Sequence, residues 1–178
     1  MHHFDTLAPK EVVTRELLDT LTGLGFSIAD YDPDRPWGAF FRFGDHQIDK
    51  FIREFFNGVP IPQNALEGER SPKLLLIAPQ RKLSWQHHDR RGEFWRVIAG
   101  RVGVVTSDTD QQPLDYRALT RGETIHIAQG KRHRLIGLDT WAIVAEIWIH
   151  TDDQHLSNEE DIHRVQDDFG RGEARSNS

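Results

Sequence analysis

The stretch LSWQHHDRRGEFW, residues 83–95, carries the side chains on which the fold and the chemistry depend. In a β-strand successive side chains point to opposite faces, so Gln86 and His88 share one face while His87 lies on the other. On the next apolar run, Glu93 alternates with apolar residues, which places a carboxylate on a face that should point inward. The stretch therefore predicts two strands that bring polar side chains into an apolar interior.

A second histidine, His133, lies on a later strand together with Leu135 and Gly137, again on a mostly apolar face. Buried charges are rarely left unpaired, and one divalent metal would neutralise Glu93 while it took neutral imidazoles as ligands. Taken singly, each residue also has a structural reading. A buried histidine is often hydrogen-bonded in a core, and Glu93 could pair with Arg96 or Arg134.

The sequence around these residues has the pattern of short strands that is typical of an all-β protein. From Ser71-Pro72 onward, short β-type runs alternate with turn residues, which is typical of a sandwich or barrel. Turns are expected at Ala99-Gly100, 107–110 and Arg121-Gly122. The expected strands are residues 73–78, 83–88, 93–99, 101–106, 115–119, 123–128, 132–138 and 142–150.

The N-terminal part has helical periodicity instead. Apolar residues recur at intervals of three or four over 9–24 and again over 45–57, which predicts two amphipathic helices. We therefore expect a helical N-terminal extension over 1–70 packed on a barrel over 71–150. Residues 151–178 are expected to form a polar C-terminal segment with a frayed end.

Composition limits the function. The chain has 178 residues, 22 Lys plus Arg against 28 Asp plus Glu, and no cysteine, which fits one domain without disulfides or thiolate chemistry. A formal charge of −6 disfavours a nucleic-acid-binding surface. The longest charge-free apolar stretch, 74–79, is far shorter than the roughly 18 residues that span a bilayer, and the start lacks a signal peptide. We expect a cytoplasmic protein that binds neither nucleic acid nor membrane.

Two spaced sets of residues identify a family resemblance. The first is Gln86-x-His88-x4-Glu93-x6-Gly100, and the second is Gly122-x5-Ala128-x-Gly130-x2-His133. Together they resemble the two-motif signature of the cupin superfamily, G-x5-H-x-H-x(3,4)-E-x6-G and G-x5-P-x-G-x2-H-x3-N. The chain departs from it at four positions, where Gln80, Gln86, Ala128 and Gly137 stand for Gly, His, Pro and Asn. The resemblance implies a double-stranded β-helix, the jelly-roll barrel of cupins, with added N-terminal helices.

Within that superfamily the chain is similar to the type II phosphomannose isomerase (mannose-6-phosphate isomerase) domain. The similarity covers most of 73–171 and a short segment before it, and it is carried by Arg35-Pro36-Trp37-Gly38, Lys73, Leu83-Ser84-Trp85-Gln86, His88, Arg91, Glu93, Trp95, Glu160-Asp161-Ile162, Arg164, Asp168, Gly170 and Arg171. It implies one divalent metal bound by Gln86, His88, Glu93 and His133, with the amide oxygen of Gln86 in place of an imidazole. Zinc is preferred, and Mn, Fe, Co and Ni remain alternatives.

Two of the catalytic candidates follow from strand parity. Glu146 lies on the inward face of an apolar strand, where burial would raise its pKa and suit it to proton transfer; a structural ion pair is the other reading. Lys73 faces the same interior, unless its ammonium group reaches water at the strand end. The third candidate, Arg164, lies in the segment that resembles the family's C-terminal signature, and it is expected to hold a distal phosphate unless it forms a surface ion pair.

Further substrate contacts are expected from Arg91, Arg171 and Trp95, although each arginine could also form a surface ion pair. The resemblance implies a metal-dependent aldose–ketose isomerase that acts on a small-molecule sugar or sugar phosphate. Two alternatives stay open: a metal-dependent cupin dioxygenase and a non-catalytic sugar-binding cupin. A homodimer is also left open.

Overall fold

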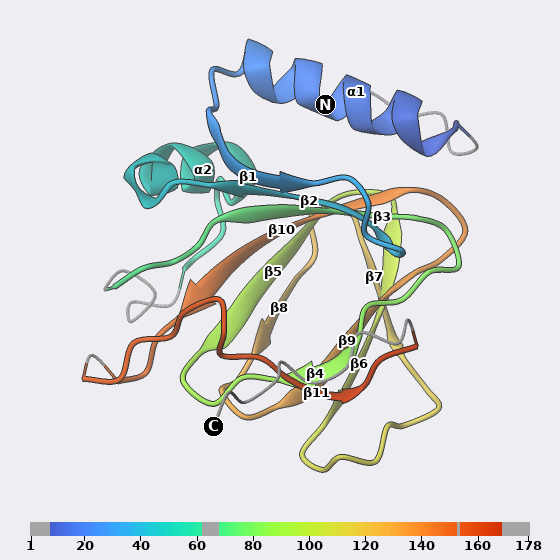
Figure 1. Cartoon of the computed structure of the whole chain (residues 1–178), viewed down its shortest axis with the longest axis vertical. Coiled ribbons are helices and arrows are strands. Elements are labelled where there is room, and N and C mark those ends of the chain that lie inside the picture. The colour runs from blue at the N-terminus through green and yellow to red at the C-terminus, as the bar shows by residue number, and fades with distance from the viewer. Residues whose placement is uncertain (1–7, 62–67, 153, 169–178) are drawn as a thin grey trace.

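The computed structural model describes residues 8–61, 68–152 and 154–168. Two antiparallel sheets face each other (Figure 1). The six-stranded sheet has the order β1-β2-β3-β10-β5-β8, and the five-stranded sheet has the order β11-β4-β9-β6-β7. All strand pairs among the described residues are antiparallel, which confirms the predicted jelly-roll architecture.

Each of the eight predicted β-runs corresponds to a strand. The structure contains β3 (Lys73–Ile77), β4 (Trp85–His87), β5 (Gly92–Ala99), β6 (Arg101–Ser107), β7 (Arg117–Thr120), β8 (Thr124–Ile127), β9 (Arg132–Gly137) and β10 (Ala142–Ile149). The C-terminal segment adds β11 (His163–Gln166), which pairs with β4.

The N-terminal region is less helical than the sequence pattern predicts. It contains α1 (Lys10–Gly23), η1 (Asp45–Gln47) and α2 (Ile48–Phe55), but also β1 (Ile28–Asp32) and β2 (Gly38–Phe43). β2 pairs with β3, so these two strands extend the six-stranded sheet of the barrel. The expectation of a purely helical extension over 1–70 is therefore wrong for 28–43, where aromatic residues alternate between the two faces of a paired strand.

The central strands of the six-stranded sheet, such as β3 and β10, are buried on both faces. The outer face of the sheet packs against Val13, Leu17 and Leu21 of α1 and against Phe51 and Phe55 of α2. Its inner face packs against the five-stranded sheet in a separate apolar cluster. Burial on both faces explains why β3 and β10 are nearly continuous apolar runs.

The end of α1 shows how the chain turns back toward the sheet. Gly25 has a φ of +72°, which a residue with a side chain adopts only at a cost, and the Phe26 amide donates to the Leu21 carbonyl at 2.9 Å. This closes the helix and directs Phe26 into the cluster beneath it. No helix among the described residues is both long and apolar enough to cross a membrane.

Candidate metal centre and its cavity

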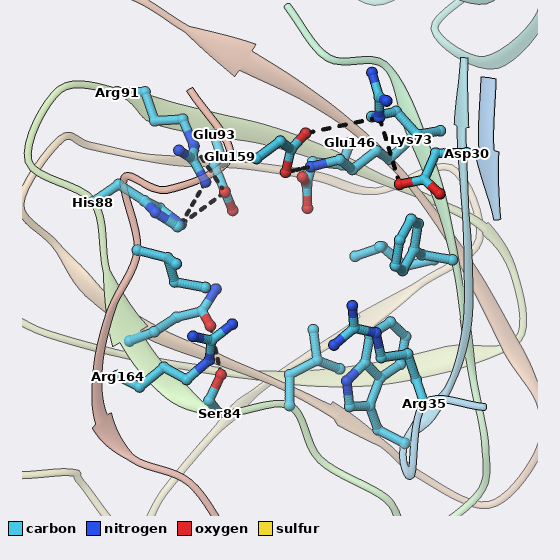
Figure 2. Close-up of a pocket in the computed structure, with 17 residues that line it drawn as sticks. Asp30, Arg35, Lys73, Ser84, His88, Arg91, Glu93, Glu146, Glu159 and Arg164 are labelled. Carbon is cyan, nitrogen blue, oxygen red and sulfur yellow. Dashed lines mark hydrogen bonds and ion pairs between the residues drawn. The ribbon is translucent and has the colours of Figure 1, made fainter. Parts of the chain in front are cut away.

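A cavity of about 310 Å³ opens between the inner face of the six-stranded sheet and the segment that carries β11 (Figure 2). Strand parity decides which side chains reach it. On β3, β5 and β10, the inward positions are apolar except for Lys73, Glu93 and Glu146. In the registers of the paired strands, Glu146 lies opposite Lys73 on one side and Trp95 on the other. Three ionisable side chains thus share one wall of the barrel.

His88, Glu93 and His133 form a buried group at one end of the cavity, and their ligand atoms lie within 4.8 Å of one another. The His88 Nε2 lies 2.9 Å from Glu93 Oε1, and the His133 Nε2 lies 3.4 Å from Glu93 Oε2. All three side chains are almost fully inaccessible to solvent. The structure therefore gathers the three residues that the sequence singled out from three separate strands and loops.

The hydrogen bonds of the two imidazoles determine what this group can bind. His88 Nδ1 contacts the carbonyl of Asp161, and His133 Nδ1 lies 2.9 Å from the carbonyl of Lys131. Because a carbonyl only accepts, each Nδ1 carries the hydrogen, and each neutral ring turns an Nε2 lone pair toward Glu93. The His133 Nε2 has no hydrogen-bond partner within the described part of the chain. Two imidazole lone pairs that face a buried carboxylate can share a metal ion with it, so these residues fit a metal site. The Arg91 guanidinium, whose Nε lies 3.5 Å from Glu93 Oε1, also supplies positive charge beside the group.

Burial and neighbouring charge shift the pKa of Glu93 in opposite directions. Burial by itself would raise the pKa of Glu93, but positive charge on its neighbours His88 and His133, when these rings are protonated, outweighs it and brings the pKa well below its usual range. Burial also lowers the pKa of His88, which favours the neutral ring that a metal requires.

Gln86 lies beside this group. Its Cα pairs with that of His133 across β4 and β9, and its side chain lines the cavity. Its Oε1 accepts a hydrogen bond from the Ser84 hydroxyl. The adjacent His87 points elsewhere, as predicted: its Nδ1 lies 3.2 Å from Asp89, and its ring stacks on His163.

Glu146 and Lys73 line the same cavity. Burial, and next the negative charge of Glu93, raise the pKa of Glu146 to about 7, against the opposing effect of Lys73. Lys73 donates to Glu159 at 2.8 Å, and its ammonium group lies 4.8 Å from the centre of a Trp148 ring. Figure 2 shows Glu159, Glu146 and Lys73 side by side along one edge of the cavity.

Two of the expected substrate contacts are engaged with protein. Arg91 lines the cavity, yet it is only 4% exposed, and its guanidinium stacks on Trp148. It donates hydrogen bonds to the Ser157 hydroxyl and to the carbonyls of Asn158 and Asp161. Trp95 is buried, does not line the cavity and donates to Glu93 Oε2 at 3.1 Å. The observed contacts of Trp95 hold the carboxylate in place, and Arg91 ties the C-terminal segment to the metal group.

The C-terminal segment supplies one expected cation. Arg164 on β11 pairs in register with Gln86 on β4 and lines the cavity, as its predicted role requires. Arg171, the other arginine expected there, lies outside the described residues.

Several residues that shape the site had no predicted role in binding or catalysis. Asp161 accepts hydrogen bonds from the backbone amides of Asp89 and Arg90 and from the Ser157 hydroxyl, so it fixes the loop that leads into β5. Other residues that line the cavity and had no predicted role include Asp30, Arg35, Arg42, Ser84 and Glu159. They come from segments far apart in the chain, and no local spacing relates them.

Comparison with known proteins gives a family match that spans most of the barrel. Residues 66–167 match the family model described as "Mannose-6-phosphate isomerase C-terminal". No curated protein matches the chain.

The fold is shared with a solved structure, and other structures match more weakly. The capsular polysaccharide assembling protein CapF from Staphylococcus aureus is 13% identical with a TM-score of 0.52; the match covers 76% of this chain and 33% of CapF. This chain therefore spans about a third of that protein. A sugar phosphate isomerase of the cupin superfamily from Silicibacter pomeroyi is 14% identical, with a TM-score of 0.43 and coverage of 63% and 60%. An oxalate oxidase is 24% identical, with a TM-score of 0.40 and coverage of 46% and 42%.

Proposed function

The chain belongs to the mannose-6-phosphate isomerase C-terminal family, and we propose that it is a metal-dependent aldose–ketose isomerase of a sugar or sugar phosphate. One observation carries the proposal. A buried Glu93 carboxylate faces the lone pairs of two oriented imidazoles, beside a second buried carboxylate, Glu146, in a cavity of monosaccharide size. This arrangement combines a site for a cation with a group that can exchange a proton near neutral pH.

His88, Glu93 and His133 would hold the divalent ion, with Gln86 as a fourth ligand through its amide oxygen. When bound, such an ion polarises a carbonyl and stabilises negative charge on neighbouring oxygens. The donor set of two nitrogens and two oxygens suits zinc, and it also accommodates Mn, Fe, Co or Ni. The hydrogen bonds from each Nδ1 to a backbone carbonyl keep the two rings oriented for this task.

Glu146 is proposed as the proton carrier. An aldose–ketose isomerisation removes a proton from C2 of the aldose and delivers a proton to C1, while the oxygens exchange hydroxyl and carbonyl character. A carboxyl with a pKa of about 7 can take up the first proton as carboxylate and return it as carboxylic acid near neutral pH. Its position opposite Lys73, on the wall shared with Glu93, directs it into the cavity.

Lys73 and Arg164 are proposed to orient the substrate. The ammonium group of Lys73 is held by Glu159 at the cavity edge, where it can donate to a sugar oxygen or stabilise an enediolate. Arg164 enters from β11 on the opposite side of the opening (Figure 2). Its planar fork suits a phosphate or a pair of hydroxyls.

The test uses a panel of aldoses and aldose phosphates with protein that has been stripped of metal and reloaded with Zn, Mn, Fe, Co or Ni. Formation of the matching ketose, lost on chelation and restored by metal, is the expected result. An oxygen electrode on the same samples separates the dioxygenase alternative, which requires oxygen uptake. A panel in which sugars bind without any turnover would replace the proposal with a non-catalytic sugar-binding role.

A further inference from the structure

The chain segment that follows β10 contacts the metal group through one main-chain oxygen. The carbonyl of Asp161 accepts from His88 Nδ1 and from an Arg91 guanidinium nitrogen, the latter at 2.9 Å. His88 Nε2 and Arg91 Nε in turn lie 2.9 Å and 3.5 Å from Glu93 Oε1. Figure 2 shows His88 and Arg91 meeting Glu93 at one end of the cavity. Since a carbonyl oxygen has two lone pairs, this single oxygen orients both groups that flank Glu93 Oε1.

The side chain of Asp161 fixes the position of that carbonyl. Its carboxylate accepts hydrogen bonds from the backbone amides of Asp89 and Arg90 at 2.9 Å and 3.0 Å, and from the Ser157 hydroxyl at 2.6 Å. The residue is 4% exposed. The two amides directly follow His88 in the chain, so the carboxylate holds the loop behind this ligand against the C-terminal segment.

The same segment continues into β11, the strand at the edge of the five-stranded sheet. β11 begins two residues after Asp161 and pairs with β4, so that His163 lies opposite His87 and Arg164 opposite Gln86 (Figure 1). The His163 ring stacks on that of His87 with 4.9 Å between their centroids. The strand that brings Arg164 to the cavity thus docks directly beside the proposed metal ligands of the loop and strand around β4.

Two roles of Asp161 make different predictions. If Asp161 only stabilises the fold, its loss lowers the free energy of unfolding and leaves the metal affinity of the folded protein unchanged. If it holds His88 ready for a metal, its loss lowers that affinity as well. The contact favours the second role, because the hydrogen bond to Nδ1 of a ligating histidine fixes its tautomer and ring orientation.

We propose that Asp161 is a positioning residue of the metal centre, and that through it metal binding and the docking of β11 stabilise each other. This inference rests on the metal site of the proposed function, but not on isomerisation. Coupling of this kind is reciprocal: the factor by which docking raises metal affinity is the factor by which bound metal favours docking. The metal would therefore help to keep β11 and Arg164 at the cavity.

The first experiment titrates Zn²⁺ into metal-stripped protein. Asp161→Ala should weaken zinc affinity by roughly 10- to 100-fold, the usual effect of losing the support behind a metal ligand. Asp161→Asn keeps one acceptor oxygen and should lie between this variant and the wild type. The matched control is Glu160→Gln, which changes an exposed neighbour that does not line the cavity and should bind zinc like the wild type.

The second experiment follows hydrogen exchange of the β11 amides with and without zinc. In the wild type, saturating zinc should slow their exchange by a factor of the same size, roughly 10- to 100-fold. The effect should be largely lost in Asp161→Ala. A residue with a structural role alone would leave the response to zinc intact. Thermal melts of the metal-free variants establish that they are folded, and if Asp161→Ala is not, Asp161→Asn and the wild-type exchange decide.

The proposal is overturned if folded Asp161 variants bind zinc as tightly as the wild type, or if zinc leaves the exchange of β11 in the wild type unchanged. A wild type that binds no metal would overturn the metal site and this proposal together. Failure of the isomerase function alone is distinguishable. In that case zinc binds and protects β11 in an Asp161-dependent manner, although no sugar of the panel is converted.

Discussion

The two faces of the six-stranded sheet have opposite chemistry. On β3, β5 and β10, the outer face presents apolar side chains to the helices, among them Leu74, Leu76, Phe94 and Ile147, and its one charged residue, Arg96, donates to the carbonyls of Phe55 and Asn57. The inner face of the same strands presents Lys73, Glu93 and Glu146 among apolar neighbours, and each of the three is at most 9% exposed. The outer face thus serves mainly to pack the helices, while the inner face keeps buried charges that an all-apolar core would not contain.

This difference indicates where function resides. Burying an ionisable group is costly unless it is paired, and a well-packed apolar residue is often as stable or more so. The outer face shows that these strands accept apolar residues at nearly every position. The charges of the inner face are therefore best explained by what they bind, and substitutions on the two faces should have separable effects.

The largest effect is expected from the metal group. His133→Ala removes an Nε2 that no hydrogen bond uses, so it should weaken metal affinity by more than about 100-fold without unfolding the chain. The outer-face variant Ile147→Val is the matched control and should bind metal like the wild type. Metal titration of stripped protein measures both. Equal affinity in His133→Ala and the wild type would remove His133 from the site.

The next effect concerns turnover. Glu146→Gln should retain metal and fold but lower kcat by roughly 10² to 10⁴, the usual contribution of a positioned acid–base group. In the wild type, activity should rise with pH as the Glu146 carboxyl ionises, because its carboxylate form accepts the proton. The pKa of about 7 applies to the metal-free site, and a bound cation should move this rise to lower pH.

The pH profile of kcat/KM checks this assignment. The rise should be absent from the residual activity of Glu146→Gln. If kcat and the pH profile of kcat/KM are both unchanged in that variant, Lys73 or solvent transfers the proton instead of Glu146.

A third prediction concerns the outer face. Leu76→Ala leaves a cavity between β3 and the helices, because Leu76 is completely buried there. It should lower the free energy of unfolding by about 2–5 kcal/mol. Denaturant unfolding of metal-free protein measures this loss. Metal affinity and kcat per folded molecule should stay at wild-type values, and a loss of either would show that the two faces are not separable.

The smallest effect is expected at the cavity edge. Glu159→Gln weakens the 2.8 Å contact that holds Lys73, but the Glu159 side chain is 52% exposed, so water replaces much of what is lost. We expect kcat to fall less than tenfold and metal affinity to remain unchanged. The neighbouring exposed residue Glu160 gives the control variant Glu160→Gln. If steady-state kinetics do not distinguish the two variants, the function of Lys73 does not depend on its contact with Glu159.

The inner face could be predicted from the sequence because strand alternation and short spacings are local properties. Parity placed Lys73, Glu93 and Glu146 on inward faces, and the spacing from Gln86 to Glu93 indicated the metal group. In the structure His88, Glu93 and His133 come together, while the metal and catalytic roles stay predictions.

The rim of the cavity could not be predicted in this way. Glu159 meets Lys73 across 86 residues, and Arg35 arrives through two strands that looked like part of a helical extension. Such contacts depend on how β2 and the C-terminal segment dock on the barrel, which no local pattern encodes. Trp95 shows a second limit of strand parity. Parity correctly predicted that Trp95 points inward, but it does not distinguish the closed core, where Trp95 lies, from the open cavity.

The central claim, that the inner face transfers a proton between sugar carbons with the help of a metal, is tested most directly by deuterium exchange. Metal-loaded protein is incubated with mannose 6-phosphate in D₂O, and NMR follows deuterium at C1 and C2. We predict incorporation by the wild type together with fructose 6-phosphate formation, its loss on chelation, and a decrease of roughly 10² to 10⁴ in the Glu146→Gln variant. Absence of deuterium incorporation into mannose 6-phosphate and into every other aldose or aldose phosphate of the panel, with stoichiometric metal bound, would contradict the claim.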